Sequence, residues 1–177
     1  IYELAYLSNV ITLANGRWQL SGGSKDWLSW QPGQRFAHLA KTWRNILGDA
    51  SAKELQNALT AAGGKNSKVT SLADNLTRTY PFADGSVSSK ITKLESLAEL
   101  IGLSAQGWMS SWAPKVLKCD HDSAAKLAEA NLPQPQGKLI CQADLTLIAP
   151  GPLPTDVEIL LRRFADTEQI GMASTYR

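Results

Sequence analysis

The segment that most constrains the fold, residues 137–177, contains one apolar run that is closed by a turn. The run extends from Leu139 to Ala149, is broken by Gln142 and Asp144, and ends at Pro150-Gly151-Pro152. It is too short to cross a bilayer, and the Pro/Gly cluster ends it, so we predict a buried strand here.

A helix and a second strand are predicted after this turn. Asp156 and Glu158 fall in the first turn of the helix, where the helix dipole favours acidic side chains. The apolar stripe of the helix consists of Val157, Leu160, Leu161 and Phe164. Gly171 follows, and residues 172–177 have the pattern of a strand, so the segment predicts a strand–helix–strand unit.

The same residues resemble the XPB/Ssl2 N-terminal-type domain of helicase-associated proteins, in its large actinobacterial form. In that group a Q-x-D-x-T-hydrophobic-x-A-P-G-P-L strand precedes a helix and a strand ending in YR. The matching positions are Gln142, Asp144, Thr146, Ala149, Pro150, Gly151, Pro152, Leu153, Tyr176 and Arg177. Family members continue beyond this pattern, so the resemblance implies that the chain stops within the domain.

Most residues of this pattern are expected to be structural. Asp144 would accept backbone N–H groups near the Pro-Gly-Pro turn, or cap the nearby helix. The functional alternative is a contact of Gln142 with nucleic acid or a protein partner, although the acidic Asp144 disfavours a phosphate at that point.

The earlier part of the chain is predicted to be mainly helical. Apolar periodicity and cap residues indicate the helices 1–7, 25–30, 32–47, 52–62, 67–79, 88–101 and 123–131. Ser51 and Glu54 have the spacing of a capping box for 52–62. Gly48 and Gly102 are placed to end the helices before them.

Two stretches of this helical part echo each other. Leu97-Ala98-Glu99-Leu100 parallels Leu4-Ala5-Tyr6-Leu7, and Gly107-Trp108 parallels Gly16-Arg17-Trp18. Asn15-Gly16 between short apolar runs predicts a hairpin, because a type I′ turn needs two residues with positive φ. Helix, hairpin and short helix in this order are typical of a winged-helix unit with its wing.

We therefore predict an α+β, mostly helical chain with four parts. Residues 1–50 hold the end of a first winged-helix-like unit plus helices, and residues 51–118 hold a second unit. Residues 119–136 form a short helix and a Pro/Gln linker, and residues 137–177 form the truncated strand–helix–strand unit. In the second unit, helices 52–62, 67–79 and 88–101 would form the core and 103–110 the wing.

The basic residues are concentrated in the first two thirds of the chain. Residues 1–118 hold thirteen Lys/Arg and eight acids, whereas residues 119–177 hold five and eight. A polyanion should prefer the first part, but the excess is smaller than in a dedicated DNA-binding domain. Candidate nucleic-acid contacts are Lys65, Lys68, Arg78, Lys90, Lys93, Arg17 and Trp18.

Each of these contacts has a structural alternative. In a winged helix the third helix enters the major groove. Here that is 88–101, whose outer face offers Ser89, Lys90, Thr92, Lys93 and Ser96, unless this face is simply solvated. Arg17 and Trp18 would touch a minor groove or stack on a base; alternatively, Trp18 packs against helix 1–7. Most of the six Trp residues are expected in the core.

No catalytic, metal or cofactor site is predicted. Cys119 and His121 are too few for a structural zinc site, and residues two apart do not by themselves form a nucleophile–base pair. Cys141 belongs to the predicted buried strand, and His38 to a solvated helix face. No glycine-rich phosphate loop is present. We expect a cytoplasmic protein with reduced cysteines and no membrane contact.

Two function classes remain. The first is a non-catalytic, helicase-associated module that contributes to DNA binding or remodelling. The second is a protein-interaction scaffold that docks a helicase or repair partner without touching DNA. Salt dependence distinguishes them, because phosphate contacts weaken steeply with salt and apolar interfaces do not.

Overall fold

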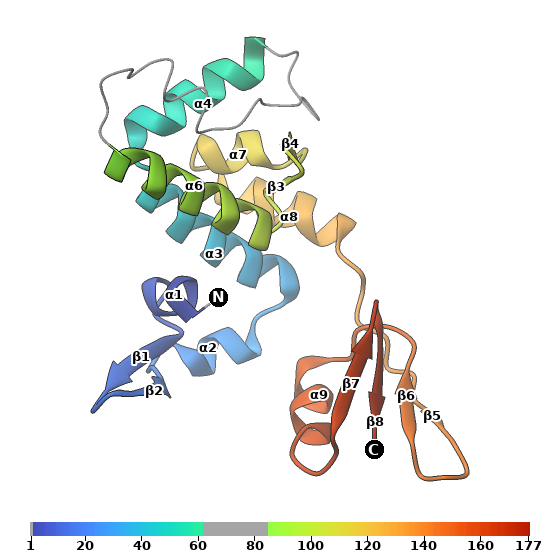
Figure 1. Cartoon of the computed structure of the whole chain (residues 1–177). Coiled ribbons are helices and arrows are strands. Elements are labelled where there is room, and N and C mark those ends of the chain that lie inside the picture. Colours follow the sequence, from blue (N-terminus) through green and yellow to red (C-terminus); the bar gives the residue numbers. More distant parts are fainter. Residues whose placement is uncertain (1, 62–84) are drawn as a thin grey trace. The chain divides into compact units, whose positions relative to one another are not determined.

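The chain folds into two compact units, Ile1–Ala130 and Asn131–Arg177. A computed structural model describes residues 2–61 and 85–177 (Figure 1). The described part is α+β and mostly helical, as predicted. Residues 1–50 and 51–118 contribute to one shared core instead of two separate ones. The predicted helix 67–79 lies outside the described residues, so the three-helix winged-helix core stays a prediction.

The first unit contains helices and two short hairpins. In chain order its described elements are α1 (Tyr2–Leu7), β1 (Ile11–Ala14), β2 (Arg17–Leu20), α2 (Ser24–Ser29), α3 (Pro32–Leu47), α4 (Asp49–Ala61), α6 (Gly85–Leu100), β3 (Ser104–Ala105), β4 (Trp108–Met109), α7 (Ala113–Leu117) and α8 (His121–Asn131). Helix α4 begins before the predicted capping box, because Asp49 lies at its dipole-favoured first turn and pairs with Arg44.

Helix α3 is the centre of this unit. It begins at Pro32, after a reciprocal capping box between Gln31 and Gln34, and ends at Gly48, whose φ is +78°. Both bounds agree with the sequence prediction. Helix α3 contacts α1, α4, α6 and α7 (Figure 1), so most of the unit is built around it.

Two buried side chains of α3 hold its neighbours through hydrogen bonds. Trp43, 1% exposed, donates its indole N–H to the backbone oxygen of Leu94 on α6 over 2.9 Å. Arg44 donates to the oxygen of Leu117 on α7 over 3.0 Å and forms an ion pair with Asp49 over 2.8 Å. These bonds fix the position of α6 and α7 on α3.

The echo in the sequence is a structural repeat. Helix α1, the β1–β2 hairpin and α2 correspond to α6, the β3–β4 hairpin and α7. Both hairpin turns consist of two residues with positive φ, Asn15-Gly16 and Gln106-Gly107. The predicted order of helix, hairpin and short helix is therefore confirmed at both places.

The repeat extends to individual backbone hydrogen bonds. In the first copy, five backbone N–H groups donate to backbone oxygens, and the pairs are Ser8 to Leu4, Asn9 to Tyr6, Val10 to Ala5, Ser21 to Val10 and Ser24 to Ser21. The second copy has the same five bonds, and the pairs are Ile101 to Leu97, Gly102 to Glu99, Leu103 to Ala98, Ser110 to Leu103 and Ala113 to Ser110. Gly102, at φ +74°, ends its helix as predicted, and Asn9, at φ +57°, takes the same place in the first copy.

The second unit is a four-stranded antiparallel sheet with one helix. Its elements are β5 (Ile140–Cys141), β6 (Leu147–Ala149), α9 (Thr155–Leu161), β7 (Thr167–Ile170) and β8 (Ala173–Tyr176), and the strand order is β5-β6-β8-β7. Its core consists of Ala149, Leu153, Leu161 and Tyr176. The predicted helix and final strand are present. Strand β7 was not predicted, because its sequence TEQI is short and polar and lies at the sheet edge.

The prediction of one buried strand over 139–149 was wrong. Residues 140–149 form the β5–β6 hairpin, and Leu145 at its turn has φ +65° and is 83% exposed. Asp144 causes the turn, because its carboxylate accepts the N–H of Thr146 over 3.1 Å. Such side-chain bonds compete with an extended strand. Cys141 is consequently exposed on an edge strand.

The Pro-Gly-Pro turn is held by the segment before the sheet. The N–H of Gln136 donates to the oxygen of Pro152 over 2.6 Å, and the Gln136 side chain lies against Gly151. A Cβ at Gly151 would approach that side chain to 3.1 Å, closer than ordinary packing allows. Gln136 therefore belongs to the folded second unit, although the sequence placed it in a linker.

Trp43→Phe should lower the free energy of unfolding by about 1–3 kcal/mol, because the Leu94 oxygen loses a buried hydrogen-bond donor. Urea denaturation followed by far-UV circular dichroism measures this. Trp108→Phe is the control, since Trp108 is 51% exposed and its replacement should cost less than about 0.5 kcal/mol. Equal losses in the two variants would contradict the central role of Trp43.

Candidate nucleic-acid interface

The outer face of α6 is exposed as predicted. All five polar residues of that face are accessible: Ser89, Lys90, Thr92, Lys93 and Ser96. The opposite face buries Leu94, Leu97 and Ala98 in the core. Lys90 and Lys93 lie three residues apart, so they share one side of the helix. Helix α6 thus presents a polar and basic surface.

Lys93 makes an ion pair that the sequence did not predict. Its ammonium group lies 2.6 Å from a carboxylate oxygen of Glu3 on α1, and the two side chains are 54% and 48% exposed. Such an exposed pair is worth less than about 1 kcal/mol, so competing charges readily replace it. Its structural consequence is larger: the pair brings α1 within side-chain reach of Lys93 on the basic face of α6.

An aromatic cluster covers the same helix α1. The Trp18 ring stacks on Tyr2, with centroids 5.8 Å apart and planes at 24°, and meets Tyr6 edge-on at 5.9 Å. All three residues remain exposed, Tyr2 by 65%, Tyr6 by 50% and Trp18 by 46%. The alternative that Trp18 packs against helix 1–7 is confirmed, and the packing leaves much of the ring surface in solvent.

The two copies of the repeat join helix and hairpin by different chemistry. In the second copy a carboxylate oxygen of Glu99 accepts the N–H of Gln106 in the hairpin turn over 3.1 Å. Glu99 corresponds to Tyr6 in the repeat, because the backbone oxygen of each residue accepts the N–H of the residue three positions later, where the helix ends. The aromatic cluster is therefore specific to the first copy, although Trp108 of the second hairpin is also exposed.

Of the other sequence-predicted contacts, the structure describes Arg17, which does not join this surface. Arg17 precedes Trp18 in β2, and neighbouring strand residues point to opposite faces, so the two side chains do not act together on one ligand. Lys65, Lys68 and Arg78 lie outside the described residues. Sequence reasoning missed Tyr2, Glu3 and Tyr6, although the i,i+4 spacing of the tyrosines indicated a shared helix face.

Tryptophan burial also differs from the expectation. Trp43 is fully buried, but Trp27, Trp30 and Trp112 are only partly buried, and Trp18 and Trp108 are exposed. Trp27 and Trp30 enclose His38, with ring centroids at 6.1 Å and 5.0 Å. His38 donates from Nε2 to the oxygen of Ser8 over 2.6 Å. Its expected place on a solvated face was therefore wrong.

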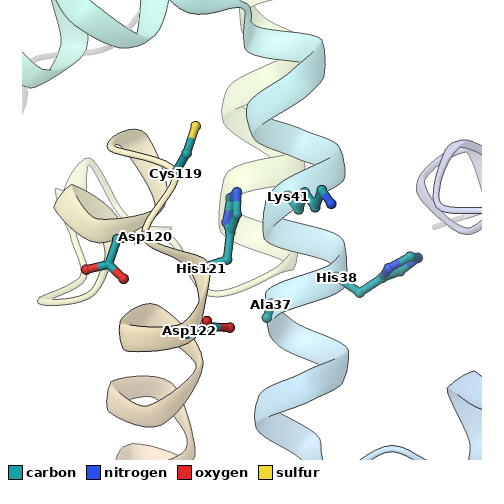
Figure 2. A pocket seen from close by; sticks show the side chains of 7 residues that line it. All are labelled: Ala37, His38, Lys41, Cys119, Asp120, His121 and Asp122. Atoms are coloured by element: carbon teal, nitrogen blue, oxygen red, sulfur yellow. The ribbon is translucent and has the colours of Figure 1, made fainter.

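An open hollow of about 400 Å³ lies between α3 and the α7–α8 turn (Figure 2). Cys119, Asp120, His121 and Asp122 line one side, and α3 residues the other. Asp120 points away from α3 (Figure 2), its carboxylate held by Lys115 at 3.4 Å and by the N–H of Ser123 at 3.3 Å. The Cys119 thiol extends away from the His121 ring, so the pair lacks the geometry of a nucleophile and base.

The surroundings of His121 in this hollow favour its neutral form. Burial lowers its pKa below 6.5, and the charges of Lys41 and Arg44 lower it further. Its Nδ1 atom is buried and lacks a hydrogen-bond partner. Within residues 2–61 and 85–177, no three His, Cys, Asp or Glu side chains gather as a metal site would require. We assign no chemistry to the hollow.

Four residues of the pattern, Gln142, Asp144, Thr146 and Tyr176, lie at the end of the sheet where β5 turns into β6. Asp144 accepts from Thr146, whose backbone oxygen accepts the N–H of Gln142 over 2.9 Å. The Thr146 hydrogen bonds, then the charge of Arg177, lower the pKa of Asp144. Tyr176 is 2% exposed in the core. The expectation that Asp144 accepts a backbone N–H is confirmed, although it does so in the hairpin turn.

Comparison with protein families, with curated proteins and with solved structures gives no match to this chain. The resemblance of residues 137–177 to the XPB/Ssl2 N-terminal-type domain therefore stays a hypothesis. In the described part of the chain no helix is both long enough and apolar enough to cross a membrane.

The state of His121 predicts how stability depends on pH. Because its pKa is lower in the folded protein, the unfolded chain binds more protons in the range below about pH 6.5, and stability falls as the pH falls through that range. His121→Gln should lose less stability between pH 7 and pH 5 than the wild type, measured as urea midpoints. Parallel losses in both proteins would contradict this account.

Proposed function

We propose that the first unit binds nucleic acid through one surface made by α6, α1 and the β1–β2 hairpin. We call it the α1–α6 surface and define it as Tyr2, Glu3, Tyr6, Trp18, Lys90 and Lys93. The observation that carries the proposal is the Glu3–Lys93 ion pair, since it places the basic face of α6 beside the aromatic cluster of α1. Cations and exposed rings together are what nucleic-acid-binding surfaces use.

The binding should be weak and dominated by few phosphates. Lys90 and Lys93 are the cations of this surface, and the net charge of the chain is only +2. Two phosphate contacts give a salt dependence of about tenfold in affinity between 50 and 200 mM salt. Such a module contributes to recognition or remodelling of DNA within a larger assembly rather than binding alone.

The context that fits this activity is a non-catalytic module of a helicase-associated, cytoplasmic protein. Support comes from the resemblance of residues 137–177 to the XPB/Ssl2 N-terminal-type domain and from the repeat of helix, hairpin and short helix in the first unit. The repeat is also what the prediction of winged-helix-like units requires. DNA repair or transcription is the setting that this resemblance implies.

A second candidate function is docking of a helicase or repair protein without DNA contact. The observation that favours it is the apolar side of the first hairpin, where Leu13 and Leu20 are 53% and 69% exposed near Trp18. Exposed apolar groups of this size are typical of protein interfaces when they are contiguous. Salt sensitivity separates the two functions, because an apolar interface changes little with salt.

The test is a titration of the chain against fluorescent single-stranded and duplex DNA at about 50 and 200 mM salt. Lys90→Glu/Lys93→Glu should abolish the salt-sensitive part of the binding. The matched control is Lys53→Glu/Lys126→Glu, which reverses two exposed lysines of α4 and α8 and makes the same change in net charge. Equal losses in the two double variants, or no binding at the lower salt, would overturn the proposed function.

A further inference from the structure

The position of α1 near Lys93 disfavours insertion of α6 into the major groove of duplex DNA. A helix with its side chains is about 10–12 Å across, and the major groove is about 12 Å wide. Helix α6 would fill such a groove by itself, but α1 lies beside its outer face at Lys93. The flanking helix would meet the groove wall before α6 reached the base edges.

The aromatic cluster has the shape that unpaired bases require. Tyr2 and Trp18 are stacked within 24° of parallel, and both keep about half or more of their surface in solvent. A base in a duplex is already stacked on both faces, whereas an unpaired base has a face to offer to such a ring. Stacking of one base on an aromatic side chain contributes about 1–3 kcal/mol.

The charges complete a site for one strand. Glu3 follows Tyr2 in α1, and its carboxylate forms an ion pair with the ammonium group of Lys93 in the unbound protein. A backbone phosphate next to a base stacked on the cluster competes with Glu3 for that ammonium group. Because the exposed pair is weak, the exchange costs little, and Lys90 is placed one turn away for a neighbouring phosphate.

We propose that the α1–α6 surface binds single-stranded nucleic acid, with bases stacked on Trp18 and Tyr2 and a phosphate replacing Glu3 on Lys93. This rests on the proposed function and specifies its ligand. Glu3 acts in it as an internal competitor that weakens binding of the free strand. Trp18 supplies the preference for unpaired bases, and the two lysines supply the dependence on salt.

The experiment compares three ligands at about 50 mM salt: a short pyrimidine strand, the same strand in a duplex, and an abasic strand of equal length. The pyrimidine strand is then measured again at about 200 mM salt. The pyrimidine strand should bind more tightly than both the duplex and the abasic strand. Trp18→Leu, which keeps an apolar side chain on the hairpin, should weaken binding of the pyrimidine strand about tenfold and leave the abasic strand unchanged.

Two control variants make the result specific. Trp108→Leu removes the exposed Trp of the other hairpin and should leave all affinities unchanged. Glu3→Gln should tighten binding of the pyrimidine strand roughly two- to fivefold, because Lys93 is released. Asp122→Asn, an exposed acid of α8, makes the same charge change and should tighten it less. Circular dichroism melts verify that each variant is folded.

The outcomes separate this inference from the proposed function. Equal binding of the pyrimidine strand, duplex and abasic strand, with Trp18→Leu unchanged and Lys90→Glu/Lys93→Glu inactive, would overturn the inference and leave the proposed function standing. If Glu3→Gln bound the pyrimidine strand with unchanged affinity, Glu3 would not act as an internal competitor for Lys93. Absence of binding to every ligand would overturn both and favour the protein-docking alternative.

Discussion

The first unit depends on one buried contact between two helices, the hydrogen bond from the Trp43 indole to the Leu94 oxygen. Trp43 is the largest fully buried side chain of α3, and a donor of this size in the core must find an acceptor. The partner it finds lies on α6, far along the chain. This contact sets α6 on α3 with its apolar face inward and its polar face outward, and the exposed lysines follow from that orientation.

The repeat explains how the candidate surface arises. Both copies use the same backbone hydrogen bonds to lead a helix into a hairpin, so the backbone geometry is fixed twice by the same rules. The side chains then differ. Where the second copy uses the Glu99 carboxylate to hold its hairpin turn, the first copy uses the rings of Tyr2, Tyr6 and Trp18. The same backbone arrangement therefore carries a carboxylate contact in the second copy and an aromatic cluster in the first.

The sequence predicted what local rules determine. The bounds of α3 followed from Pro32 and Gly48, and the first hairpin followed from Asn15-Gly16, because capping and turn chemistry act within a few residues. The apolar run 139–149 misled because it contains a turn. The Asp144 carboxylate accepts the N–H of Thr146 there, and the N–H of Leu145 donates to the Gln142 oxygen. The Glu3–Lys93 pair and the place of His38 between two Trp rings depend on distant packing, and no local pattern encodes them.

In the proposed function, Trp18 and no other exposed Trp contacts nucleic acid. The most direct measurement is fluorine NMR of the chain labelled with 5-fluorotryptophan, which gives one signal for each of its six Trp residues. On addition of a short single strand, the Trp18 signal should shift and those of Trp43 and Trp108 should stay in place. A shift of the Trp108 signal with the Trp18 signal unmoved would overturn the proposed role of Trp18.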